Sequence, residues 1–171
     1  MIFACREAPS NHLVVGRIEG ISQELLIERS VLKHLSRYRQ LTPWSTEAGG
    51  QLFGTIDTDK VCVAEAAGPY AGDDRSRYRY RSNPVAAQCA IDQRFQRGLL
   101  YLGEWHSHAE NQPNASGLDD DAMRRLIANS RLNSNTLLML IVGRTLGVDG
   151  LSAWSIANAR AYQWQLQALK K

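Results

Sequence analysis

Cysteine and histidine are both scarce in this sequence, which narrows the kinds of site that it can form. The three cysteines, Cys5, Cys62 and Cys89, are an odd number without close spacing. They favour reduced thiols in a cytoplasm and argue against a structural zinc knuckle. The sequence has four histidines. It therefore lacks the several further histidines that two-metal phosphoesterases and amidohydrolases need beside a His-x-His pair.

Long apolar runs and a strong charge of either sign are also missing. No apolar run approaches the length of a membrane span. Residues 1–10 carry Arg6 and Glu7 without a long apolar core, so we expect a loose arm and not a signal or transit peptide. The net charge of +3 does not by itself argue for nucleic-acid or membrane binding. A composition that is 44% hydrophobic and 22% charged is typical of a soluble globular protein, and 171 residues suit one domain spanning 1–171.

The hydrophobic pattern predicts a mixture of strands and helices. Apolar residues at helical spacing predict helices over 30–38, 85–97 and 122–132. Alternating or continuous apolar runs predict strands over 12–18, 24–27, 61–67, 75–81, 99–102, 136–142 and 151–156. Residues 47–54 read as the start of a strand, and residues 157–171 fit strand or helix. Because these elements alternate irregularly, the sequence predicts an α/β (α+β) fold, a mixed β-sheet flanked by helices.

The strand predicted at 99–102 runs into two histidines, His106 and His108. Residues two apart on a strand face the same side, so the two imidazoles project together. Such a pair is a poor core element but a good half of a metal site. A loop follows, and a helix beginning near Asp119 could bring that carboxylate over the histidines. Two histidines and an aspartate with one open position are the ligand set of a catalytic zinc. The Pro-Cys-x-x-Cys motif of the zinc nucleobase deaminases is absent.

Ser116 and Asp119 also have a structural interpretation. Ser-x-x-Asp ahead of an apolar helix is a variant of the capping box, and acids suit the first turn of a helix. Local reasoning favours helix capping over metal binding for any one of these residues. The nearby histidine pair makes metal binding the favoured interpretation for Asp119 alone. A zinc hydrolase also needs a general base beside its water. Glu104 lies on the strand of His106, while Glu47 precedes two glycines that allow close approach. Local reasoning does not choose between them.

These residues together resemble a known signature. Glu47 in a Glu-x-Gly-Gly-x-Leu-x-Gly setting, then His106-Ser107-His108, seven residues, Ser116, two residues and Asp119 match in order and spacing the pattern of the JAMM (MPN-plus) metallopeptidases. The resemblance covers residues from about 25 to 156. It implies a single MPN-like domain, with a curved sheet between helices. It also implies one Zn²⁺ per chain bound by His106, His108 and Asp119. Glu47 becomes the general base, Ser116 stabilises the tetrahedral intermediate, and Glu104 keeps a supporting or structural role.

The chain is most similar to the compact bacterial JAB-type branch, including the deconjugating peptidases of anti-phage operons. That branch implies isopeptidase activity on the C-terminal tail of a ubiquitin-like protein or its conjugate, with E1/E2-like enzymes of the same operon as partners. Two other functions stay open at this point. One is a peptidase that processes a sulfur-carrier protein, and the other is a non-catalytic scaffold of the same fold. Ala109 replaces the proline that commonly follows the second histidine, which removes no catalytic group.

A second feature is the alternating run from Arg75 to Arg81. As a strand, it places four arginines on one face, with tyrosines on the other: Arg75, Arg77, Arg79 and Arg81. The structural interpretation is a solvated cationic face above core aromatics. The functional interpretation is a surface that binds an acidic partner, with nucleic acid less favoured.

Overall fold

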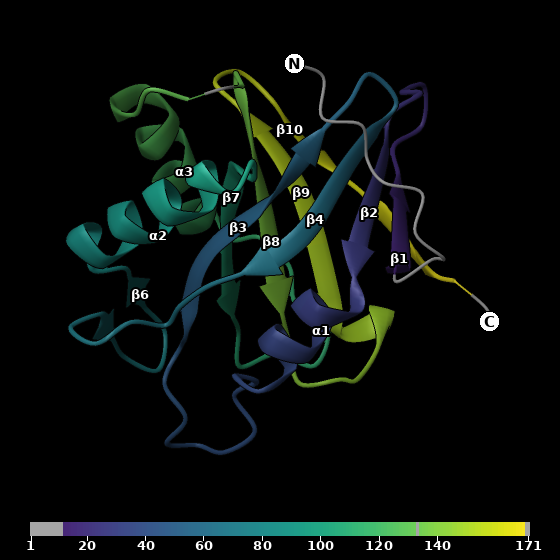
Figure 1. Cartoon of the computed structure of the whole chain (residues 1–171). Coiled ribbons are helices and arrows are strands. Elements are labelled where there is room, and N and C mark those ends of the chain that lie inside the picture. The colour runs from purple at the N-terminus through teal and green to yellow at the C-terminus, as the bar shows by residue number, and fades with distance from the viewer. Residues whose placement is uncertain (1–11, 133, 170–171) are drawn as a thin grey trace.

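The computed structural model describes residues 12–132 and 134–169, with side chains described from residue 14 onward. The arm expected at residues 1–10 lies outside these residues. Figure 1 shows one large curved sheet with helices packed against it. Among the described residues, no helix is both long and apolar enough to cross a membrane.

Nine strands form the main sheet, in the order β10-β9-β8-β7-β3-β4-β2-β1-β11. Their bounds are β1 His12–Arg17, β2 Glu24–Glu28, β3 Gly49–Ile56, β4 Lys60–Ala66, β7 Leu100–Ser107, β8 Thr136–Val142, β9 Leu151–Ala157, β10 Ala161–Gln163 and β11 Gln165–Ala168. The pairs β2–β4 and β7–β8 are parallel, and the other pairs are antiparallel. The expected curved mixed sheet is therefore confirmed.

One segment of chain forms both outer strands of this sheet. Residues 157–171 had no clear assignment as strand or helix, and the structure forms two strands over 161–163 and 165–168: β10 pairs with β9, and β11 pairs with β1 at the opposite end of the order. Trp164 lies between these two strands and is buried. Its amide donates to the Ala153 carbonyl at 2.9 Å, and its indole donates to the Ser155 hydroxyl at 2.9 Å. The sheet thus curves until one short segment connects its two ends.

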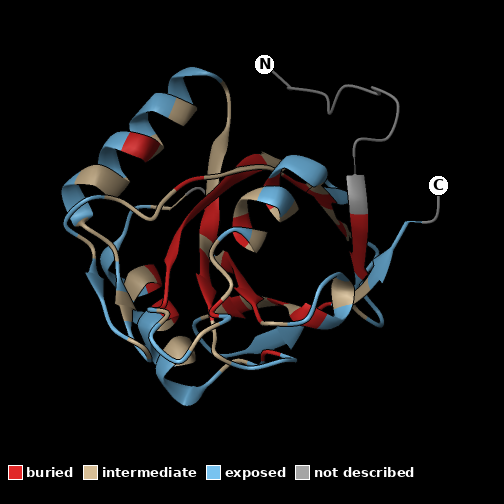
Figure 2. Cartoon of the chain, turned by 90° about the horizontal axis from the view of Figure 1, so that it is seen from below, coloured by how far each residue is buried: buried red, intermediate tan, exposed pale blue. Residues whose placement is uncertain are grey.

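Within residues 12–132 and 134–169, three α-helices cover the sheet: α1 Arg29–Ser36, α2 Pro84–Gln96 and α3 Gly117–Asn129. Strand β8 shows how the two faces are used, because its side chains alternate between two cores. Leu138 and Leu140 join the core that includes Val31 and Leu35 of α1. The alternate residues of β8, such as Met139, pack instead against α3. Figure 2 shows the buried residues concentrated along the curved sheet, with exposed residues on the outer helices.

The strand predicted over 75–81 is wrong. The chain forms two short strands there, β5 Asp74–Arg75 and β6 Tyr80–Arg81, which pair as a hairpin. The residues between them turn, and the Ser76 amide donates to the Arg79 carbonyl at 2.8 Å. Alternation failed as a signal because no strand of the main sheet pairs with this hairpin. The four arginines therefore do not form one strand face.

Candidate metal centre and active site

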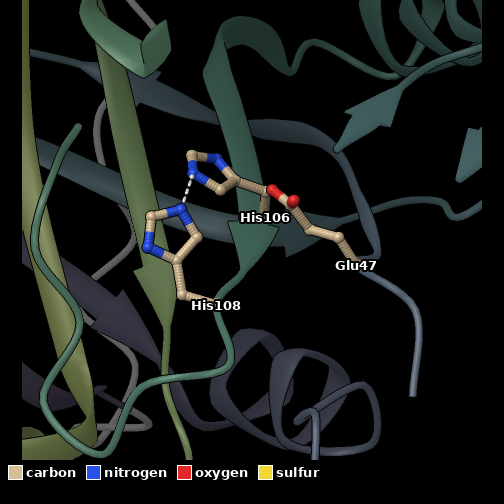
Figure 3. A group of neighbouring side chains, drawn as sticks. All are labelled: Glu47, His106 and His108. Carbon is tan, nitrogen blue, oxygen red and sulfur yellow. Dashed lines mark hydrogen bonds between the residues drawn. The ribbon is translucent and has the colours of Figure 1, made fainter. Parts of the chain in front are cut away.

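The two histidines converge at the end of β7, as the strand spacing predicts. Their Nε2 atoms are 3.1 Å apart, and Figure 3 shows the rings facing one another. His106 is buried within β7, and the His108 amide donates to the Val142 carbonyl at 2.9 Å, which continues the pairing with β8. Gly103 lets the two strands approach closely, because a Cβ atom there would lie 1.8 Å from the Leu138 carbonyl oxygen. Main-chain pairing between β7 and β8 thus holds the backbone that carries both imidazoles.

Asp119 both caps a helix and faces the histidines. Its Oδ2 accepts hydrogen bonds from the Ser116 amide and hydroxyl, each at 2.7 Å, and its own amide donates to the Ser116 hydroxyl oxygen at 3.2 Å. These bonds complete a capping box at the start of α3. The same carboxylate places Oδ1 3.2 Å from His106 Nε2 and Oδ2 3.5 Å from His108 Nε2. A carboxylate has two oxygens, so the two interpretations of Asp119 do not exclude one another.

These separations suit a metal ion. A tetrahedral zinc about 2.0–2.1 Å from its nitrogen and oxygen ligands spaces them about 3.3–3.4 Å apart. The three donor separations of 3.1, 3.2 and 3.5 Å bracket that value. Two histidines and one aspartate form a borderline-hard donor set with one position left for water or substrate. The side chains present therefore fit a catalytic metal ion.

Electrostatics favour a charged Asp119. Burial works to raise the pKa of its carboxyl, but hydrogen bonds with His106 and His108 outweigh burial and hold the pKa well below its usual range. Burial likewise works to lower the pKa of His108, and Asp119 reverses that effect, so the pKa of His108 is raised. The Nδ1 atom of His108 lies 3.7 Å from an exposed carboxylate, that of Glu110. Carboxylates in this place orient many metal-binding histidines.

Glu47 reaches the same site from a different part of the chain. It lies two residues before β3, and Gly49 of that strand pairs with His106. Glu47, His106 and His108 each place one donor atom within 4.8 Å of the other two (Figure 3). The Glu47 side chain is buried, and this burial raises the pKa of its carboxyl despite the opposing effect of the histidines. A carboxylate whose pKa is raised toward neutrality is suited to accept and pass on a proton.

Glu104 makes different contacts. Its carboxylate accepts hydrogen bonds from the Tyr101 hydroxyl at 2.6 Å and from the Gln51 amide at 3.0 Å. The Gln51 side chain in turn accepts from the Tyr70 hydroxyl at 2.6 Å. Burial raises the pKa of Glu104 to about 7, although the two hydrogen bonds oppose that shift. The sequence left Glu47 and Glu104 as alternative candidates for the general base. In the structure, Glu47 lies beside both histidines, whereas Glu104 belongs to a polar network along β7.

Comparison with known proteins places the chain in a family. A family model described as prokaryotic homologues of the JAB domain matches residues 28–157. The chain belongs to this Prok-JAB family. The expected kinship with the bacterial JAB-type branch is therefore confirmed.

Two curated proteins are similar to this Prok-JAB chain over most of their length. A protein of Vibrio cholerae named CD-NTase/cGAS isopeptidase is 35% identical over 123 residues, which cover 70% of this chain and 76% of that protein. A protein of the same name from Pseudomonas aeruginosa is 34% identical over 123 residues, covering 70% and 77%. A solution structure of a protein from Desulfitobacterium hafniense covers 80% of this chain and 87% of its own, with a TM-score of 0.58 and 20% identity. That last likeness shows the fold alone.

The sequence analysis missed the residue that ties the two halves of this Prok-JAB site together. Ser107 lies between the histidines, points to the opposite face and is fully buried. Its hydroxyl accepts from the Ala48 amide at 3.0 Å and donates to the Gln40 side chain at 3.4 Å, while its amide donates to the Ala48 carbonyl at 2.7 Å. Ala48 follows Glu47, so Ser107 fixes the chain beside Glu47 against the strand of the histidines. The signal was present in the sequence, because a hydroxyl on the inward face of a buried strand requires a partner.

Proposed function

We propose that this chain is a zinc-dependent isopeptidase. One observation carries the proposal: three donor side chains from β7 and α3 converge at metal-ligand spacing, and the buried carboxylate of Glu47 stands beside them. His106, His108 and Asp119 are the proposed ligands. Glu47 is the proposed general base and Ser116 the oxyanion donor. The complete set of ligands and base favours an enzyme over a scaffold that has lost its metal.

The chemistry assigned to each residue follows from its environment. Zinc held by the three ligands would supply a Lewis acid for the scissile carbonyl and lower the pKa of a water molecule. Glu47 accepts the proton of the attacking water and delivers it to the leaving amine, a transfer that its burial and raised pKa assist. The Ser116 hydroxyl, which here donates to Asp119 Oδ2, is exposed and can turn its proton toward the developing oxyanion.

The names of the relatives guide the proposed substrate. Both are CD-NTase/cGAS isopeptidases, so we assign to this chain the isopeptide bond between the C-terminus of a CD-NTase and a lysine of another protein. The C-terminal tail of a ubiquitin-like protein, which the resemblance to the JAMM metallopeptidases implies, is the other substrate class of this proposal. Anti-phage defence and E1/E2-like partners belong to this proposal because the chain resembles the deconjugating peptidases of anti-phage operons.

The test uses a CD-NTase joined through its C-terminal carboxyl to the side-chain amine of a lysine peptide. Mass spectrometry follows its cleavage by the wild type, by Glu47→Gln and by Glu19→Gln, a matched control at an exposed glutamate. We expect cleavage by the wild type and the control, loss in Glu47→Gln, and about one zinc per chain by elemental analysis, absent from a His106→Ala/His108→Ala variant. Cleavage by Glu47→Gln at the wild-type rate would refute the mechanism, and a zinc-free wild type would refute the metal.

A further inference from the structure

The β5–β6 hairpin binds the main chain of Glu47 on both sides. The Glu47 amide donates to the Ser76 carbonyl at 2.7 Å, and the Arg75 Nε donates to the Glu47 carbonyl at 2.7 Å. Glu47 lies before the first residue of β3, so its own peptide groups take no part in the ladder of the main sheet. The hairpin supplies the hydrogen bonds that a neighbouring strand would otherwise supply.

The hairpin is itself anchored next to Glu47. The Tyr80 ring lies against Gly49, where a Cβ atom would come within 2.5 Å of that ring. The Tyr80 hydroxyl donates to Asp73 at 3.1 Å, and the other carboxylate oxygen of Asp73 accepts from the Asn83 amide at 2.7 Å. Asp73 therefore connects Tyr80 of the hairpin to Asn83, and the Tyr80 ring packs the hairpin against β3, the strand that follows Glu47.

The arginines of this hairpin have different contacts. Arg79 pairs with Asp74 at 2.6 Å, and both of these side chains are more than half exposed. Arg81 is exposed on β6. Arg75 alone among the four donates to the main chain of Glu47. These contacts set Arg75 apart from the other three arginines, and binding of an acidic partner stays a prediction.

We propose that Arg75 is a positioning residue for Glu47, and that the hairpin holds the Glu47 main chain in place. The proposal rests on the role of Glu47 in the proposed function, and it gives Arg75 a role other than binding an acidic partner. A carboxylate that shuttles a proton must lie within hydrogen-bond reach of both the water and the leaving amine. Displacing such a group by about 1 Å can lower a rate about 100-fold. Two hydrogen bonds to one residue limit that displacement.

The experiment compares Arg75→Ala and Arg75→Lys with Arg81→Ala, which removes the same charge from the same hairpin. Cleavage of the isopeptide-linked conjugate gives kcat and KM separately. Hydrogen exchange of the peptide containing the Glu47 amide reports how firmly that segment is held, whether or not the enzyme turns over. Zinc content shows whether the metal site is intact.

For Arg75→Ala we expect kcat to fall about ten-fold with KM and zinc content unchanged, and exchange at Glu47 to rise about ten-fold. Arg75→Lys should recover part of both losses, because an ammonium can donate to the same carbonyl. Arg81→Ala should match the wild type. The proposal would be overturned if Arg75→Ala kept the wild-type hydrogen exchange and the wild-type kcat. It would also be overturned if Arg75→Ala and Arg81→Ala both raised KM, because that result would favour binding of an acidic partner by the arginines. A wild type that cleaves no conjugate would refute the proposed function instead, and the exchange measurement would still decide whether Arg75 holds the Glu47 segment.

Discussion

Replacing Asp119 by Asn separates its two roles. The Asn carbonyl can take the place of Oδ2 and still accept from the Ser116 amide, which keeps the cap. Its NH₂ group then faces His106, where Oδ1 now lies 3.2 Å from Nε2, and an amide nitrogen is not a zinc ligand. Without metal the variant should lose the stability that the Asp119 charge gains beside His106 and His108 in addition to any weakening of the cap, and it should bind zinc poorly.

The loss of stability from the weakened cap and the loss of zinc affinity can both be calculated. Weakening a helix cap costs about 1 kcal/mol, which lowers Tm by about 2–4 °C in a protein of this size. Losing an orienting partner of a metal ligand costs about 10–100-fold in affinity, so losing the ligand itself should cost at least about 100-fold. Zinc at about 100 times the wild-type Kd stabilises the wild type by about 2.7 kcal/mol, or about 5–11 °C. At the same zinc concentration the variant should gain about 0.4 kcal/mol, or about 1–2 °C.

Thermal unfolding with and without zinc measures both quantities in one assay. Asp120→Asn is the matched control, because Asp120 lies in the same helical turn and pairs with Arg124 at 2.8 Å. It should keep the full zinc-induced rise in Tm. A full zinc-induced rise in Asp119→Asn would show that Asp119 is only a cap and would refute the ligand assignment.

Two further predictions concern the residues around the site. Burial raises the pKa of Glu104 to about 7 in the folded protein, against 4.5 for the carboxyl in the unfolded chain. The folded protein therefore binds the carboxyl proton more tightly than the unfolded chain does. The stability that this proton binding contributes is lost as the pH rises from about 4.5 to about 7. In denaturant unfolding of the metal-free proteins, the free energy of unfolding of the wild type should fall by about 3 kcal/mol relative to that of Glu104→Gln between about pH 4.5 and about pH 7. If the unfolding free energies of the two proteins changed in parallel with pH, the raised pKa of Glu104 would be contradicted. Ser107→Ala leaves the buried Ala48 amide without its side-chain acceptor, at a cost of about 1–3 kcal/mol, so Tm by calorimetry should fall about 2–12 °C. The control Ser22→Ala, at an exposed serine, should change stability by less than about 0.5 kcal/mol, and an equal loss in both variants would mean that Ser107 makes no special contribution.

The histidine pair could be predicted because it depends on one local rule. Side chains two apart on a strand share a face, and β7 keeps that rule through His106. The place of Asp119 depends instead on the loop that precedes α3, whose path no short-range period determines. Glu47 is harder still, because it approaches the histidines only through the pairing of Gly49 with His106. The choice between Glu47 and Glu104 therefore needed the three-dimensional pairing and, in addition, the partners that Tyr101 and Gln51 give to Glu104.

The hairpin marks the limit of the same local rule. Alternation from Arg75 to Arg81 is as regular as in a true strand, yet the chain turns after Ser76. A period of two indicates a strand only where a neighbouring strand is available, and availability is a property of the whole sheet. The uncertain assignment of 157–171 has the same origin. Residues 161–163 and 165–168 become strands because β9 and β1 each present an edge to them.

The way in which the sheet closes sets the order in which this protein can be completed during translation. Residues 161–168 supply both outer strands, so each of the other strands is synthesised before either edge of the sheet is covered. A nascent chain that lacks this segment presents two unpaired edges, one on β9 and one on β1, and unpaired edges recruit other chains. A ribosome that stalls before residue 161 would therefore release a species with most of its core but a strong tendency to associate. Once residues 161–168 are made, the edges of the sheet are the short strands β10 and β11 in place of the longer β9 and β1, and short edge strands offer less backbone for another chain to pair with.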